Sequence, residues 1–357
     1  MRGKTCNQSS MVCLVSPEVA VPEDHPLRAI RAIADEALRS QSRRFDRMYA
    51  DTGRPSVPPE RLLKGQLLIA LYSIRSERQL CEQLQYNLLF RWFLDMDMLE
   101  PAFDATTYSQ NRERLMTHEV AARFFAAVRG QAADMMSRDH FTVDGTLIEA
   151  WASLKSFRPK DEDDDDRDNN GWGDFRGLRR SNDTHESTTD PEARLMRKGS
   201  GQPAKLSYMG HALVENRHGL LVDLRVSSAT GYAEREAALV MLDAADHAAR
   251  FTVGADRGYD TRDFVDDCRG IGATPHVAQH QTRRRSAIDD RTTRHLGYSI
   301  SQRIRKRIEQ VFGWAKTVGG LRRTRYRGLR RTQFATHIVG AAYNLLRIAH
   351  LRRELAT

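Results

Sequence analysis

The sequence predicts an α/β protein in which an all-helical N-terminal region precedes a mixed β-sheet with helices on both of its faces. Residues 25–137 carry apolar side chains at helical spacing. At His140 the pattern changes to HFTVDGTLIEAW, an alternating segment rich in β-forming residues. Helix-like and strand-like segments then follow one another to the C-terminus, which is the order expected of an α/β fold.

The predicted N-terminal domain covers residues 25–137 and follows a loose arm over residues 1–24. Three helical segments are expected within it: 27–38, 60–93 with a break near Ser76, and 107–136. We expect the last segment to begin with a capping box formed by Thr107 and Gln110. Small helical domains of this kind often dimerise or bind DNA, although solubility is the commoner explanation for scattered surface arginines.

The second predicted domain spans residues 138–357 and begins with the strand that carries Asp144. The glycine after this aspartate permits close approach of other groups. A polar insertion at about 157–203 follows, and its acidic run DEDDDDRD is expected to be solvated rather than to bind metal. The later elements are expected in this order: two hairpin strands around 216–219, a helix at 234–249, a strand ending at Asp256, a helix at 261–269, a strand at 273–278, and helices at 299–316 and 331–353.

This order of elements predicts a ribonuclease-H-like sheet, in which three antiparallel strands are followed by alternating helices and strands. The first and fourth strands are neighbours in such a sheet, so Asp144 and Asp256 can converge with Glu309 of the 299–316 helix. In-line cleavage of a phosphodiester can use two divalent ions roughly 4 Å apart. Mg²⁺ prefers oxygen ligands and keeps several waters, so two or three carboxylates suffice to bind it.

The helix predicted over 299–316, SISQRIRKRIEQVFGWAK, is expected to start with a capping box formed by Ser299 and Gln302. One face of this helix is apolar, and another carries Gln302, Arg305, Glu309 and Lys316. Glu309 has two interpretations: an i,i+4 ion pair with Arg305, or a metal ligand beside cations that bind phosphate. The two strand-borne aspartates favour the second interpretation.

Charge is distributed unevenly along the chain, whose net charge is +9. Residues 283–331 contain sixteen Lys or Arg and only three acids, a density that attracts a phosphate backbone. No run of eighteen apolar residues and no secretion signal is recognisable, so we expect a cytoplasmic protein. The four cysteines are widely spaced, which indicates neither a disulfide framework nor a zinc site.

Three motifs of this chain resemble those of the DDE transposases of bacterial insertion sequences, of the IS-4/IS-5 type. They are VDGTLIEA around Asp144, GADRGYD around Asp256, and the spacing R-x3-E-x6-K formed by Arg305, Glu309 and Lys316. The tyrosine usual in the last motif is replaced by Gln302. Segments of the N-terminal domain, such as GRPSVPPERLL and YNLLFRWF, also resemble the helical domain of these proteins.

The resemblance implies that Asp144, Asp256 and Glu309 bind two Mg²⁺ ions, for which Mn²⁺ would substitute. Metal-activated water would cleave DNA at the terminal inverted repeats of the element, and the 3′-hydroxyl ends would then be joined to target DNA. The protein would act on bacterial double-stranded DNA at the nucleoid, as a dimer or higher oligomer. The residues expected to contact DNA are Arg305 and Lys316, together with Arg303, Arg322, Arg323 and Arg325 of the basic block.

Other interpretations remain open on the sequence alone. An inactive element product could act as a DNA-binding repressor, a host nuclease could share the fold without joining ends, and a structural basic protein would need no carboxylate. Asp223, Glu234 and Asp260 could replace one of the three acids, but surface, helix-start and turn positions explain them better. His276 is better explained as a packed or surface residue than as a ligand.

Overall fold

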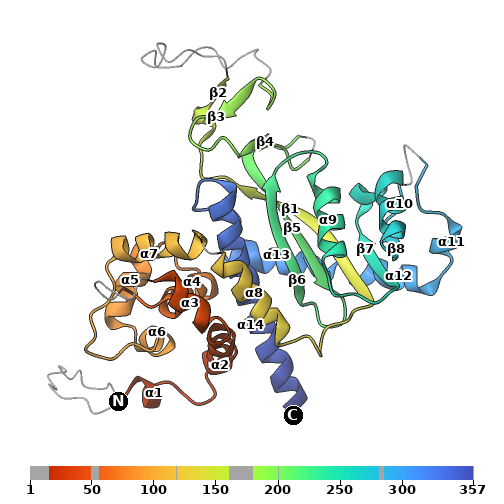
Figure 1. The fold of residues 1–357 in the computed structure, drawn as a ribbon. Helices are drawn as coiled ribbons and strands as arrows, with labels where there is room; N and C mark the ends of the chain where they lie inside the picture. The colour runs from red at the N-terminus through yellow and green to blue at the C-terminus, as the bar shows by residue number, and fades with distance from the viewer. Residues whose placement is uncertain are drawn as a thin grey trace, which may run out of the picture.

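The computed structural model describes residues 16–49, 56–117, 119–160, 180–199, 201–280 and 285–356. Helices of the N-terminal region gather on one side and the mixed sheet lies on the other (Figure 1). The long C-terminal helix α14 (Leu329–Ala356) runs between these two parts. No helix among the described residues is long and apolar enough to cross a membrane.

The described N-terminal region is helical, as predicted. Its helices are α1 (Pro17–Ala20), α2 (Pro26–Arg39), α3 (Ser42–Met48), α4 (Pro59–Leu71), α5 (Glu77–Tyr86), α6 (Leu88–Phe93), α7 (Ala105–Thr117) and α8 (Val120–Gly130). Ser76 caps α5, so the predicted break near this residue is confirmed. The predicted capping box at Thr107 is wrong, because Asp104 Oδ2 accepts the Thr107 N–H at 2.9 Å and the helix begins earlier.

The main sheet has the strand order and directions of the predicted ribonuclease-H-like fold. Its strands are β1 (His140–Glu149), β4 (Arg194–Met196), β5 (Lys205–Glu215), β6 (Leu221–Ser228), β7 (Phe251–Ala255) and β8 (Ala273–Val277). The order is β4-β5-β1-β7-β8, and β6 also pairs with β5. β5 runs antiparallel to β1 and β6, whereas β7 and β8 run parallel to β1. The first strand and the Asp256 strand are therefore neighbours.

Helices cover both faces of this sheet. Phe141 and Val143 of β1 pack in a core with α9 (Ala233–Asp243) and α10 (Arg262–Gly270). Because side chains alternate along a strand, the even-numbered residues of β1 face the other side. That side is covered by α12 (Leu296–Ile304), α13 (Arg307–Thr317) and α14, and the short α11 (Asp290–Thr293) lies beside β8.

The single helix predicted over 299–316 is wrong, because the chain forms two helices, α12 and α13, with a break around Arg305. Ser299 does not cap a helix start, since its hydroxyl donates to Leu296 O at 2.8 Å inside α12. Gln302 is not part of a capping box either. Its side-chain amide donates to His276 O at 2.6 Å, so α12 is held against β8.

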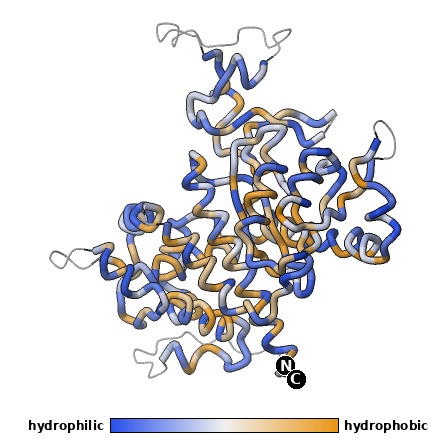
Figure 2. The backbone as a smooth tube through the Cα atoms, turned by 45° about the vertical axis from the view of Figure 1, so that its right-hand side comes forward, coloured by the Kyte–Doolittle hydropathy of each residue, from blue (hydrophilic) through white to orange (hydrophobic). Residues whose placement is uncertain are grey.

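One apolar core joins the two predicted domains. It contains residues of α2, α4 and α8 together with Val311 of α13, Leu345 of α14, and Leu224 of β6. In Figure 2 hydrophobic stretches of the backbone, coloured orange, run through the interior of both parts. The N-terminal helices are therefore part of the support on which α13 and α14 rest.

The predicted insertion contains regular structure. β2 (Phe157–Pro159) and β3 (His185–Ser187) form a two-stranded sheet that projects from the body (Figure 1). β4, which lies inside the same segment, pairs with β5 in the main sheet. The acidic run over 161–168 lies outside the described residues.

Candidate active site

Asp144 and Asp256 lie opposite each other on neighbouring strands. β1 and β7 pair His140 with Thr252 and Thr142 with Gly254. Asp256 follows β7 directly and keeps an extended backbone, so two more residues along the same register bring it opposite Asp144. Neighbouring strands are about 4.8 Å apart, and paired side chains point to the same face. The register therefore forms an acid pair from residues more than a hundred positions apart.

The environment of Asp144 reflects this pairing. Burial raises the pKa of Asp144 to about 7, and the negative charge of Asp256 contributes to the same change. The Gly145 N–H, which donates to Asp144 Oδ1 at 2.8 Å, and the charge of Arg305 act in the opposite direction. Two carboxylates held this close would be stabilised by a cation between them.

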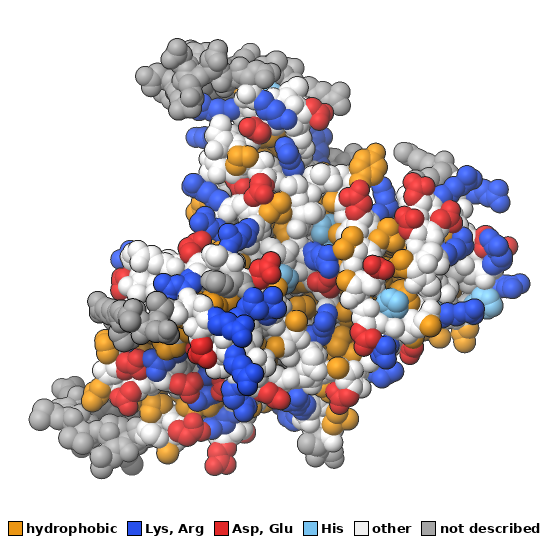
Figure 3. All heavy atoms as spheres, in the orientation of Figure 1, with side chains coloured by type: hydrophobic (Ala, Val, Ile, Leu, Met, Phe, Trp, Pro, Cys, Tyr) orange, Lys and Arg blue, Asp and Glu red, His pale blue; other side chains and the backbone are white. Residues whose placement is uncertain are grey.

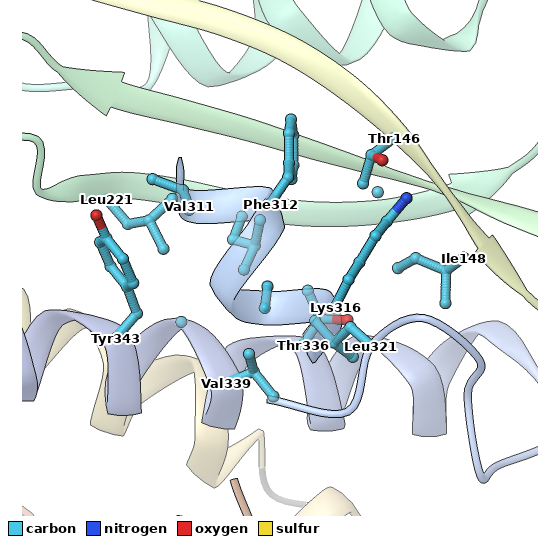
Figure 4. Close-up of a pocket in the computed structure, with 14 residues that line it drawn as sticks. Thr146, Ile148, Leu221, Val311, Phe312, Lys316, Leu321, Thr336, Val339 and Tyr343 are labelled. Atoms are coloured by element: carbon cyan, nitrogen blue, oxygen red, sulfur yellow. The ribbon is translucent and has the colours of Figure 1, made fainter. Parts of the chain in front are cut away.

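Cations from α12 and α13 border the acid pair. Arg305 ends α12, and a Cβ added to Gly254 of β7 would lie 3.3 Å from the Arg305 Cβ. Lys316 extends from α13 toward Thr146 of β1 (Figure 4). Burial lowers the pKa of Lys316, as do the neighbouring cations Lys198 and Arg322, whereas Asp144 raises it. Arg305 and Lys316 thus both lie within electrostatic range of Asp144.

Glu309 lies on α13 and is exposed. It is seven residues before Lys316, so both side chains project from nearly the same face of the helix. The ion pair between Arg305 and Glu309, considered from the sequence, is absent from the ion pairs recorded among the described residues. Within the described chain, no group of three His, Cys, Asp or Glu side chains is close enough to hold a metal ion. The three-carboxylate site stays a prediction.

Glu234, which was considered from the sequence as a replacement acid but was better explained as a helix-start residue, lies near the acid pair. It lies in the first turn of α9, as expected, but its side chain reaches over Gly145. A Cβ at position 145 would lie 2.8 Å from both Cγ and Cδ of Glu234. Burial raises the pKa of Glu234, and the charge of Asp256 adds to the effect. Gly145 has no side chain, so it leaves room for the side chain of Glu234. This glycine is the feature of the sequence that indicated the approach of another group.

The donor set fits a divalent cation. Mg²⁺ is commonly bound by one or two carboxylates together with waters and substrate phosphates. Asp144 and Asp256 provide two such carboxylates on neighbouring strands. Arg305 and Lys316 border this pair as a positive rim. Their charges favour a phosphate of the substrate as a further ligand of the ion.

The remaining predicted DNA-binding residues differ in exposure. Arg303 and Arg322 are exposed. Arg323 donates to Ala150 O at 3.2 Å and to Trp151 O at 2.8 Å, and its guanidinium stacks on the Trp151 ring. Some of its N–H donors are therefore already bonded within the protein. Arg325 is partly buried beside Tyr326. Figure 3 shows further Lys and Arg side chains on the N-terminal helices where these border the sheet.

The other polar residues weighed from the sequence have structural roles. Asp260 accepts the N–H groups of His280 at 2.7 Å and Ala287 at 2.8 Å, so both of its carboxylate oxygens have backbone partners. Asp223 accepts the Leu224 N–H and pairs with Arg225. His276 is a buried strand residue, as preferred from the sequence, and its ring contacts Ser301.

Two protein families match this chain. The family described as "Transposase domain (DUF772)" matches residues 15–114, and the family described as "Transposase DDE domain" matches residues 176–345. The first covers most of the helical region, and the second extends from the insertion into α14. No curated protein matches the chain.

Several solved transposase structures are distantly similar. A piggyBac transposase synaptic complex with hairpin DNA shares 9% identity and a TM-score of 0.42, over 92% of this chain and 76% of that chain. A pre-cleavage Mos1 transpososome shares 13% identity and a TM-score of 0.21, over 87% of each chain. A Mos1 mariner paired end complex with Mn shares 13% identity and a TM-score of 0.21, over 92% of this chain and 97% of that chain.

Proposed function

We propose that this chain, which matches a transposase domain family over residues 15–114 and a transposase DDE domain family over residues 176–345, moves a bacterial insertion sequence by cutting and joining DNA. It would bind the terminal inverted repeats, cleave the phosphodiester with activated water, and join the 3′-hydroxyl ends to target DNA. The observation that carries this proposal is the Asp144 and Asp256 pair, bordered by Arg305 and Lys316. The IS-4/IS-5 type belongs to the same proposal and rests on the three sequence motifs.

Each side chain of the site has a distinct task in this reaction. Asp144 and Asp256, with Glu309, would hold two Mg²⁺ ions, which Mn²⁺ would replace. When bound, these ions supply activation of the attacking oxygen and neutralisation of the leaving oxygen. Arg305 and Lys316 would bind the phosphates that flank the scissile bond, because guanidinium and ammonium groups donate charge-assisted hydrogen bonds. The strands fix the acids before the substrate arrives, which lowers the cost of ordering them.

The proposed DNA partner explains the basic block better than a structural role does. Lys198 and Arg322 extend the positive rim beyond Lys316 toward solvent, where a duplex backbone would displace counterions. Joining two element ends calls for two active sites, so we propose a dimer or a higher oligomer in the DNA complex. This last step rests on the chemistry of end joining, not on an interface in the structure.

Cleavage and strand-transfer assays test the proposed function. Labelled duplexes made from the DNA that flanks the coding sequence would be incubated with the purified protein and Mg²⁺ or Mn²⁺. We expect nicks at the element ends, followed by joining of pre-cleaved 3′ ends to a plasmid. Cleavage without joining would indicate a nuclease, and binding without cleavage would indicate a repressor; either result would contradict the proposal.

The third carboxylate requires a separate comparison of Glu309→Gln with Glu234→Gln. The resemblance assigns Glu309, whereas proximity to Asp256 favours Glu234. If Glu309 is the ligand, its substitution should reduce cleavage at least ~100-fold, in line with loss of a metal ligand or its direct support, and Glu234→Gln should have a smaller effect. The opposite ranking would transfer the role to Glu234. Glu236→Gln, on an exposed position of α9, is the matched control.

A further inference from the structure

Gln302 is held at both ends of its side-chain amide. Its Nε2 donates to the backbone carbonyl of His276 on β8 at 2.6 Å. Its Oε1 accepts the Nε–H of Arg305 at 2.8 Å. A glutamine amide carries a donor and an acceptor on one group, so it can bridge a carbonyl and a guanidinium. The residue is therefore a direct link between the sheet and Arg305.

The sheet side of this link is rigid and buried. His276 Nδ1 is 2.7 Å from Ser301 Oγ, and the same hydroxyl is 2.8 Å from His140 Nε2 on β1. Ser301 is 1% exposed and His276 is 7% exposed. Tyr298 of α12 also donates to Val277 O at 3.0 Å. α12 is thus fastened to both β1 and β8 within one turn of Gln302.

Arg305 is restricted from the other side by β7. Its Cβ approaches Gly254, where an added Cβ would lie 3.3 Å away. Because Gln302 occupies the Nε–H, the terminal NH1 and NH2 groups remain for other partners. No hydrogen bond of these two groups is recorded among the described residues. Gly254 lies two residues before Asp256 and faces the same side of the sheet, so the contact with Gly254 places Arg305 on the side of the acid pair, and its charge lowers the pKa of Asp144.

We propose that Gln302 is a positioning residue that holds Arg305 so that its two terminal nitrogens bind one phosphate of the DNA at the acid pair. This inference rests on the proposed function for the identity of the phosphate. Two parallel N–H donors match two phosphate oxygens, and a guanidinium already fixed at Nε loses less freedom when it binds. The glutamine is the residue at which this chain departs from the usual tyrosine of the motif it resembles.

A double-mutant cycle between Gln302→Met and Arg305→Ala tests the link through DNA binding. The probe is a fluorescent duplex of arbitrary sequence, titrated in Ca²⁺ at several NaCl concentrations. Methionine has a similar size but offers neither the donor nor the acceptor, so Gln302→Met should weaken binding about 5-fold and reduce the salt slope by up to ~1, as expected for a lost phosphate contact. In the Arg305→Ala background the same substitution should change affinity by less than about twofold, because contacting residues are not additive.

A merely structural role would give a different pattern. It would lower Tm and weaken binding equally in both backgrounds, and that result would overturn the inference, as would unchanged binding by Gln302→Met. Gln302→Glu keeps the acceptor for Arg305 and should bind DNA better than Gln302→Met. Gln310→Met, on an exposed position of α13, is the control that should stay within about twofold of the parent.

The experiment separates this inference from the proposed function. If the parent binds the duplex with the predicted coupling but cleaves no element end, the positioning role stands and the transposase activity fails. If the parent cleaves and joins ends while Gln302→Met binds and cleaves like the parent, the positioning role fails alone. If the parent does not bind duplex DNA at all, both are overturned.

Discussion

The two sides of the proposed active site are fixed by different kinds of interaction. Asp144 and Asp256 lie on neighbouring parallel strands, where the β1–β7 register brings them together. Arg305, Glu309 and Lys316 come from two short helices whose positions depend on contacts with β8 and α14. Sheet-borne residues are set by a repeating ladder, whereas helix-borne residues depend on a few side-chain bonds. The acids of the sheet should therefore tolerate change least.

Substitution of the sheet acids should have the largest effect. Asp256→Asn and Asp144→Asn should each reduce DNA cleavage by at least ~1,000-fold, because a neutral amide cannot replace a carboxylate ligand. Gel-based cleavage assays measure the loss, and DNA binding should persist. Asp144→Asn should also raise the Tm of the metal-free protein, since it removes one of two neighbouring like charges.

Asp263→Asn provides the control for these variants, because Asp263 is exposed on α10. It should cleave DNA like the parent. If Asp256→Asn cleaved DNA nearly as fast as the parent, the role proposed for the acids of the sheet would be wrong.

The helix side depends on the core beneath α13 and α14. Leu345 of α14 is fully buried in the core that joins the two regions. Leu345→Ala should lower the free energy of unfolding by about 2–5 kcal/mol, because it leaves a cavity. Denaturant titration measures the loss. Leu355→Ala, on the same helix but with 78% of the residue exposed, should change it by less than about 0.5 kcal/mol. Equal effects of the two variants would contradict the packing of α14 against both regions.

Acid should weaken the packing around three buried histidines of the sheet and of α14. Burial lowers the pKa values of His211, His276 and His337 to about 4. Between pH 6.5 and 4 the unfolded chain takes up protons at these residues and the folded chain does not. The stability that these neutral histidines contribute is therefore complete above pH 6.5 and falls as the pH drops, by up to about 1.4 kcal/mol per pH unit for each histidine.

Denaturant titrations at pH 7.5 and pH 5 measure this change. His276→Gln should reduce the difference between the two pH values, because it removes one titrating group. An equal difference between the two pH values in the parent and in His276→Gln would show that His276 is not buried as a neutral group.

The smallest expected effect comes from substitution of Lys316, one of the cations that border the acid pair. Lys316→Ala should weaken binding of a DNA duplex several-fold and reduce the salt slope by about 1, as for loss of a single phosphate contact. Fluorescence anisotropy at several salt concentrations measures both quantities. Lys155→Ala, on an exposed 3-10 turn (Leu154–Ser156) before β2, should bind like the parent. An unchanged salt slope for Lys316→Ala would exclude this lysine from the DNA contact.

The sequence predicted the sheet side of the site well, for a physical reason. Period-two patterns and the order of strands and helices determine which strands become neighbours, and that was enough to pair Asp144 with Asp256. The hairpin around 216–219 was also predictable, because its turn is determined by residues close together in the chain. Gly219 has a positive φ, and Glu215 accepts the N–H groups of His218 and Leu220. Such features depend on residues close together in the chain or on a regular register.

The helix side was predicted less well, because its geometry depends on distant partners. Ser299 and Gln302 have the spacing of a capping box, yet Gln302 bonds to a carbonyl 26 residues earlier in the chain. The orientation of Glu234 toward the acid pair depends on how α9 packs over Gly145, and helical periodicity does not specify that packing. Glu309 was placed on a helix correctly, but its distance from the aspartates is not encoded by that pattern.

Calorimetric titration of the metal-free protein with Mn²⁺ is the most direct test of the central claim, that Asp144 and Asp256 together bind a divalent cation. The account predicts saturable binding by the parent and by Asp263→Asn, and a loss of affinity of at least ~10-fold, typical of a lost metal ligand or its support, for Asp144→Asn and for Asp256→Asn. Equal Mn²⁺ affinity in all four proteins would contradict it.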